Sequence, residues 1–263
     1  MREMTMDAPQ ATPALLLLRT RPELDALARW AAATGQRALR EDPGYALHAA
    51  LKATLGAVAP KPFALVQRAD GCQFIGYVQA ERAAVERALQ LAADTEPGAA
   101  EALGLDRDDV VVKPMPGDWR VGERLDFEVR VAPVVRSRIA GNGSGAEVDA
   151  AFHPSFAGED ADDRAAAHQR WLARELARGS AATLLNSHAI GFRLAPIARR
   201  GAEASGQQPG RHTRNGLLPD LSVRGQLSVE NPEAFAALLA RGLGRHRSFG
   251  FGCLLLAPPG SWT

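Results

Sequence analysis

The feature that most constrains the fold is an order of strand and helix signals that occurs twice along the chain. Residues 14–116 predict a strand, a helical region, a hairpin, a helix and a final strand in succession, and residues 117–263 repeat this order. Each strand and helix buries only one face, so a series of this kind pairs its strands in one sheet and lays its helices against that sheet. The sequence therefore predicts the same α+β unit twice.

The first unit is located by apolar alternation in its strands and by helical spacing in its helices. Its second helix has end signals, because Asp42 is a candidate N-cap, Pro43 suits the first helical position and Gly56 suits the stop. The expected elements are a strand over 14–20, a helix over 22–33, a helix over 43–56, a hairpin of 63–67 and 72–79, a helix over 81–93 and a strand over 110–113.

The second unit follows a segment dense in proline and glycine, residues 113–123, which is the best candidate for a domain boundary. Its last helix begins after the cap Asn231 and stops at Gly242. The expected elements are a strand over 125–135, a loop over 141–163, a helix over 161–179, a strand over 189–196, a basic loop, a strand over 221–229, the capped helix and a strand over 249–257.

Both units fit the split β-α-β-β-α-β pattern. The predicted fold class is α+β, with two tandem ferredoxin-like domains. We expect a flexible N-terminal tail over residues 1–13, an N-terminal domain over 14–116 and a C-terminal domain over 117–263.

Composition indicates an ordinary globular protein, with 46% hydrophobic residues and a formal net charge of +1. We expect a reduced, cytoplasmic protein, because no signal peptide or membrane span is recognisable and Cys72 and Cys253 have neither metal nor disulfide spacing. The near-neutral total conceals one basic segment, residues 186–216, with five arginines and a single acid. This segment indicates either a local anionic partner or a solvated loop.

The stretch GLGRHRSFGFGC, residues 242–253, places four glycines before the last apolar run. It matches neither a dinucleotide fingerprint nor a P-loop, because the glycine spacing differs and no lysine follows Lys113. Glycines in such a loop allow backbone N–H groups to cradle phosphate oxygens. The alternative is a helix C-cap followed by a bulge in an edge strand.

Three blocks carry a resemblance to a known family. They are DPGYALHAALKATLG with PKPFALV, VGERLDFEVRVAPVVRSR, and NPEAFAALLARGLGRHRSFGFGCLLLAP. In this order they resemble the RAMP proteins of CRISPR systems and, more narrowly, the CasE type of precursor-processing endoribonuclease from the type I-E Cascade complex. One departure is Ala132, which stands before Pro133 where the family has asparagine.

The resemblance implies a Tyr-x-x-His catalytic pair, which falls on Tyr45 and His48. Residues at i and i+3 share one helical face. A histidine that titrates near neutrality can accept the ribose 2′-OH proton or protonate the leaving 5′-oxygen, and the sequence leaves both roles open. The alternative is a semi-buried structural histidine beside the stripe formed by Leu47, Leu51 and Leu55.

The resemblance also implies phosphate-binding residues for a repeat stem-loop. The family's lysine near the site has no counterpart in the second half of the chain, so Arg136 and Arg138 are its expected substitutes. The full set of expected RNA-binding residues is Arg136, Arg138, Arg199, Arg200, Arg211, Arg214, Gly242, Gly244, Arg245, Arg247, Gly250 and Gly252. We assign no metal site and no cofactor, because the histidines lack metal-ligand spacing.

The function implied is metal-independent cleavage of CRISPR precursor RNA at the base of the repeat stem-loop. The expected partners are the hairpin RNA, as precursor and mature guide, and the other Cascade subunits. A catalytically inactive hairpin-binding scaffold of the same fold is the alternative. A third, more distant hypothesis is an unrelated ferredoxin-like protein whose glycine loop binds a small anionic ligand.

Overall fold

The computed structural model describes residues 14–34, 43–68, 71–137, 146–156, 163–199 and 214–262. The expected tail over residues 1–13 and the N-cap candidate Asp42 lie outside these ranges. In the described part of the chain, no helix is both long and apolar enough to cross a bilayer.

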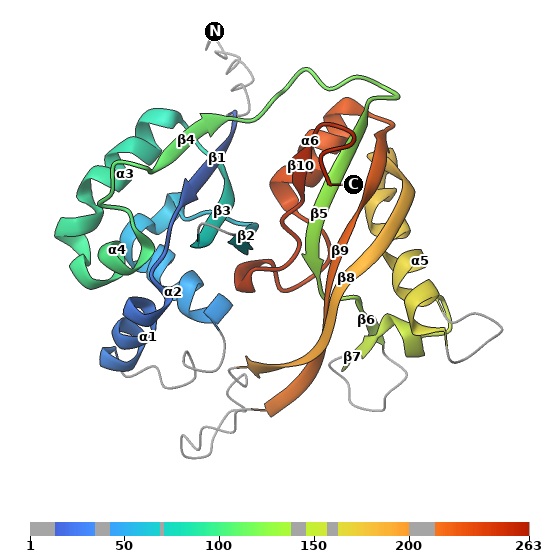
Figure 1. The fold of residues 1–263 in the computed structure, drawn as a ribbon, viewed down its shortest axis with the longest axis horizontal. Helices are drawn as coiled ribbons and strands as arrows, with labels where there is room; N and C mark the ends of the chain where they lie inside the picture. Colours follow the sequence, from blue (N-terminus) through green and yellow to red (C-terminus); the bar gives the residue numbers. More distant parts are fainter. Residues whose placement is uncertain are drawn as a thin grey trace, which may run out of the picture.

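The first half folds into one four-stranded antiparallel sheet with helices on one side (Figure 1). The strand order is β2-β3-β1-β4, which is the order of a ferredoxin-like unit. Its elements are β1 (Leu15–Thr20), α1 (Leu24–Ala33), α2 (Pro43–Leu55), η2 (Gly56–Val58), β2 (Phe63–Arg68), β3 (Gly71–Gln79), α3 (Arg82–Thr95), α4 (Pro97–Leu103) and β4 (Val111–Pro114).

The second half repeats this topology with the strand order β10-β5-β9-β8. The α+β class with two ferredoxin-like units is therefore confirmed. Its elements are β5 (Arg124–Val131), β6 (Val134–Ser137), β7 (Ala146–Asp149), η3 (Ala150–Phe152), α5 (Arg164–Leu176), η4 (Arg178–Ser180), β8 (Ala182–Arg199), β9 (Arg214–Val229), α6 (Pro232–Arg241), η5 (Arg247–Phe249) and β10 (Leu255–Ala257).

Three expectations about the elements are wrong. Helix α4 and the β6–β7 hairpin were not expected, and β7 lies in a segment expected to be a loop. The last strand begins at Leu255 and not at Phe249, because residues 247–249 form a 3₁₀ turn and Gly250 and Gly252 have positive φ. A positive φ takes the backbone out of the extended region that a strand requires.

Strands β8 and β9 are also longer than the alternation indicated. Their pairing continues as far as Arg199 on β8 and Arg214 on β9. Figure 1 shows both strands extending beyond the other strands of the sheet. The expected basic loop is thus partly a β-ladder. Two irregularities in the β8 register, between Leu184 and Asn186 and between Ala189 and Gly191, interrupt the alternation that locates a strand in a sequence.

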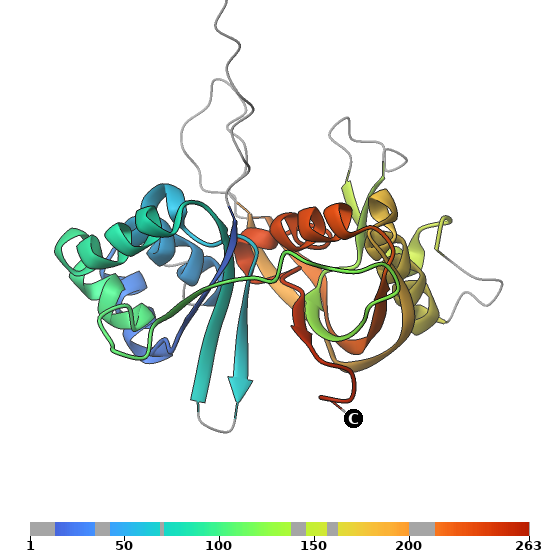
Figure 2. The ribbon, with the colours of Figure 1, turned by 90° about the horizontal axis from the view of Figure 1, so that it is seen from above.

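The two halves lie side by side and share a hydrophobic core (Figure 2). Tyr77 on β3 is 1% exposed and packs in the same cluster as Cys253 and Leu254 of the second half. Its hydroxyl donates a 2.6 Å hydrogen bond to the Leu254 carbonyl oxygen. Breaking a buried bond of this kind costs roughly 1–3 kcal/mol. The shared core therefore fixes how the C-terminal segment sits against the first sheet.

Candidate functional site

Helix α2 of the first half meets the glycine-rich loop, residues 242–253, of the second half. The Phe249 ring stacks on Tyr45 with centroids 5.5 Å apart and an interplanar angle of 11°, and it meets the His48 ring edge-on at 6.3 Å. This approach requires Gly44, because a Cβ built there would collide with the carbonyl oxygen of Phe249. The structure thus places Tyr45 and His48 together, as expected, and adds Phe249 as their neighbour.

The environment of His48 favours its neutral form. The side chain is partly buried, whereas Leu47 and Leu51 beside it are in the core. Burial lowers the pKa of His48 below its ordinary value of 6.5, and the positive charges of Lys61 and Lys52 lower it further. A neutral imidazole carries one donor and one acceptor nitrogen, so His48 is able to accept a proton near pH 7.

This electrostatic coupling predicts the direction of a shift in the variant Lys61→Gln. Removing the ammonium group removes a repulsion on the imidazolium, so the pKa of His48 should rise toward 6.5. An NMR titration of the His48 ring, assigned with the variant His48→Asn, measures it. The matched control is Lys113→Gln, because Lys113 on β4 is exposed and does not contribute to the shift. An unchanged or lowered pKa in Lys61→Gln would contradict this coupling.

A positively charged groove of about 520 Å³ lies beside this contact and includes Phe249 in its lining. Its walls come from β6, the end of α5, the glycine-rich loop and Lys61. One acid, Glu175, faces six cations, namely Lys61, Arg136, Arg174, Arg178, Arg245 and Arg247. Such an excess of one sign raises the local concentration of anions, and a row of guanidinium groups suits phosphate.

Several of these cations are held in place by the protein. Arg245 bonds the Glu147 carboxylate on β7 at 2.7 Å, and His246 bonds its second oxygen at 2.9 Å. Arg247 donates to the Arg241 carbonyl oxygen at 2.7 Å. Burial and the neighbouring arginines lower the pKa of the Arg247 guanidinium below its ordinary range. The β6–β7 hairpin thus anchors the loop that carries Phe249.

Only some of the arginines expected to bind RNA have side chains that the structure describes. Arg136, Arg245 and Arg247 line the groove. Arg199 and Arg214 end the β8–β9 ladder, and only their backbone is described. The remaining three, Arg138, Arg200 and Arg211, lie outside the described residues.

Sequence reasoning missed Lys61, Arg174 and Arg178, and it did not predict that Phe249 packs on Tyr45. Arg174 on α5 and Arg178 on η4 resemble an ordinary solvated helical face in the sequence, and Lys61 lies in a loop before β2. A positively charged helix end is the one signal that was available, and it is weak on its own.

The four glycines of the loop all have positive φ and tight neighbours inside the protein. A Cβ at Gly242 would lie 2.9 Å from Pro62, and one at Gly244 would lie 2.8 Å from Trp171. The N–H groups of Gly242, Gly244 and Gly252 donate to acceptors within the protein. Packing therefore accounts for these glycines, and their contact with RNA stays a prediction.

Sequence comparison then places the chain in a family. Residues 17–258 match the family model described as CRISPR associated protein. The chain belongs to this CRISPR-associated protein family. No curated protein matches it in sequence.

Solved structures share the fold of this CRISPR-associated chain at low sequence identity. The CRISPR endoribonuclease Cse3 bound to a 19-nucleotide RNA is 19% identical with a TM-score of 0.61, covering 93% of this chain and 100% of that one. Cse3 of Thermus thermophilus, bound to an RNA that represents a pre-cleavage complex, is 18% identical with a TM-score of 0.57 and the same coverage. A chain of a CRISPR RNA-guided surveillance complex is 17% identical with a TM-score of 0.50, covering 92% and 99%.

Proposed function

We propose that this CRISPR-associated protein is an endoribonuclease that cuts CRISPR precursor RNA at the base of the repeat stem-loop. The observation that carries the proposal is the position of His48 and Tyr45 against Phe249, which also lines the cationic groove. RNA held by its phosphates in this groove would pass beside a titratable imidazole. The likeness to the structure of the CRISPR endoribonuclease Cse3 bound to RNA supports this proposal.

The reaction is an internal transesterification. The ribose 2′-oxygen forms a bond to the adjacent phosphorus, the bond from phosphorus to the 5′-oxygen breaks, and the products are a 2′,3′-cyclic phosphate and a 5′-hydroxyl. The proton leaves the 2′-OH, and another reaches the leaving oxygen. We assign proton removal to His48, because its lowered pKa keeps the imidazole neutral.

The remaining roles in the proposal are electrostatic. The Tyr45 hydroxyl orients the nucleophile or the phosphate, and Lys61 stabilises the charge of the pentacoordinate phosphorus, in place of the arginines expected from the sequence. The nucleophile belongs to the substrate, so the reaction needs no metal-activated water. In this proposal residues 14–116 supply the catalytic helix, and residues 117–263 supply most of the groove.

The groove also suits retention of the product. Double-stranded RNA is recognised largely by its shape and its phosphates, and the six cations that line the groove would provide phosphate contacts. We propose that the protein keeps the mature guide RNA bound and joins the other subunits of a cytoplasmic effector complex. The surveillance-complex chain of the same fold supports this part of the proposal.

The test is cleavage of a repeat hairpin from the source genome, in the presence of EDTA. The proposal expects one cut at the base of the stem and a 2′,3′-cyclic phosphate end. A matched RNA with 2′-deoxyribose at the scissile nucleotide should bind equally and remain intact. Tight binding of the hairpin without any cut would make the protein a scaffold. Cleavage of the deoxy substrate would refute the internal nucleophile.

A further inference from the structure

The second sheet has a face on the side opposite α5 and α6, here called the open face, that is polar over β5 and over residues 220–228 of β9. Side chains alternate across a strand, and the odd-numbered residues of β5, such as Phe127 and Val129, are buried in the core. The even-numbered residues of β5 and β9 point the other way. Along β5 and between residues 220 and 228 of β9 they are Arg124, Asp126, Glu128, Arg130, Asp220, Ser222, Arg224, Gln226 and Ser228.

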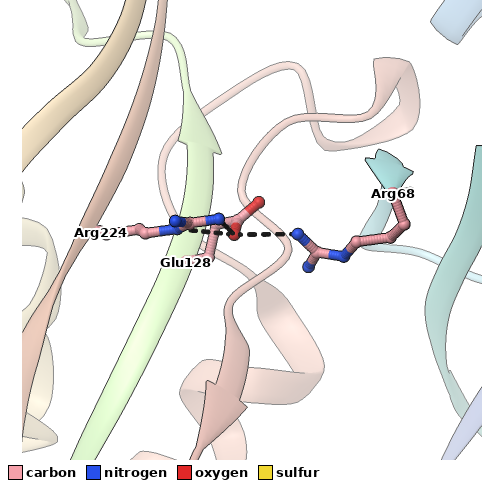
Figure 3. A network of polar contacts seen from close by, with 3 residues as sticks. All are labelled: Arg68, Glu128 and Arg224. Atoms are coloured by element: carbon pink, nitrogen blue, oxygen red, sulfur yellow. Dashed lines mark hydrogen bonds and ion pairs between the residues drawn. The ribbon is translucent and has the colours of Figure 1, made fainter. Parts of the chain in front are cut away.

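Each of two carboxylates on this face is bonded by two arginines. Glu128 accepts from Arg224 at 2.9 and 3.0 Å and from Arg68 at 3.4 Å, and Figure 3 shows the carboxylate between the two guanidinium groups. Asp220 accepts from Arg130 at 2.7 and 2.8 Å and from Arg193 at 2.7 Å.

Four guanidinium groups on two carboxylates leave a positive excess on the face. Burial acts to raise the pKa of Asp220, but the bonds and charges of Arg130 and Arg193 outweigh it and leave the pKa below its ordinary value. The carboxylate is therefore ionised, and one arginine already balances it. Arg193 is 70% exposed, which leaves most of its guanidinium accessible to a further anion.

The second arginine on each carboxylate is not needed to balance its charge, because Asp220 already pairs with Arg130 and Glu128 already pairs with Arg224. Arg68 reaches Glu128 from β2 of the first half, so the positive face continues across the junction of the two halves. The amide of Gln226 and the indole of Trp262, whose ring lies 5.9 Å from the Arg224 guanidinium, are next to the arginines. Guanidinium, amide and aromatic groups together suit unpaired nucleotides.

We propose that the open face of the second sheet binds single-stranded RNA that flanks the hairpin. This inference rests on the proposed function, because the unpaired strand belongs to the RNA that the protein is proposed to cut. The cationic groove is formed in part by α5, which covers the opposite side of the same sheet. A hairpin in the groove leaves the open face to the unpaired strand that continues from the stem.

The test uses the double variant Arg193→Gln/Arg224→Gln. Asp220 keeps Arg130 and Glu128 keeps Arg68, so neither carboxylate loses its last counter-charge. The matched control is Arg82→Gln/Arg87→Gln, which removes the same charge from exposed positions of α3. Fluorescence anisotropy measures binding of three RNAs: the hairpin alone, the hairpin with a single-stranded uridine extension, and the extension alone.

The wild-type protein and the α3 control should bind the extended hairpin more tightly than the hairpin alone. The open-face variant should lose this gain and keep its affinity for the hairpin. The slope of log affinity against log salt concentration, measured with the extended hairpin, should decrease in magnitude by about two. A gain that survives in the variant, or no gain in the wild type, overturns the inference. If the wild-type protein does not bind the hairpin, the proposed function is overturned. Binding of the single-stranded uridine extension by itself still tests the open face in that case.

Discussion

The variant His48→Ala should cut the repeat hairpin about 10²–10⁴ times more slowly than the wild type and bind it with the same affinity, because general acid–base catalysis contributes this factor. Its imidazole lies edge-on to Phe249, where α2 meets the glycine-rich loop. The side chain is partly buried and makes an edge-on contact with one ring, so its removal should leave the groove intact.

Single-turnover cleavage with saturating protein measures this loss, and anisotropy measures the binding. The control His153→Ala removes a histidine that lies outside the groove, and it should cut at the wild-type rate. Tyr45→Phe should show a smaller loss than His48→Ala, because it keeps the ring that stacks on Phe249. A His48→Ala protein that cuts at the wild-type rate would make His48 a structural residue.

The variant Gly44→Ala should destabilise the protein and slow cleavage, although alanine is the better helix former. Alanine at this position of α2 would favour the helix by about 1 kcal/mol. Its Cβ, however, would collide with the main-chain carbonyl of Phe249, which no side-chain rotation relieves. Overpacking of this kind costs about 1–3 kcal/mol. A shift of about 1 Å in the loop would slow cleavage about 10²-fold.

Urea unfolding and single-turnover cleavage report the two effects separately. The matched control is Gly117→Ala, because a Cβ at Gly117 has no neighbour within 4 Å. That control should unfold and cut as the wild type does. If Gly44→Ala also behaves like the wild type, the close contact between α2 and the glycine-rich loop is not needed for activity.

Much of the fold was predictable because its signals are local. Helix α6 begins at Pro232 after the cap Asn231, whose side chain accepts from the Ala234 amide, and it ends before Gly242, as expected. The hairpin of β2 and β3 follows the predicted alternation. A helix cap, a turn or an alternating strand depends on residues a few positions apart, so each can be recognised in the sequence.

The site was predictable only in part. The resemblance to the CasE type implied Tyr45 and His48 as a pair on one helix, and in the structure both rings contact Phe249. Their catalytic role stays a prediction. The expected contact of the loop glycines with RNA also stays a prediction, and three of their N–H groups donate to acceptors within the protein.

The sequence by itself determined the two repeated units, most of their helices, the β2–β3 hairpin and the candidate pair on α2. Only the tertiary structure decided that Phe249, near the end of the chain, packs on Tyr45, and that Lys61 joins the arginines of β6 and α5 in one groove. The physical reason is the range of the interactions. Helix and strand signals arise between neighbours in the chain, whereas the groove and the open face depend on residues that meet only when the two halves pack together.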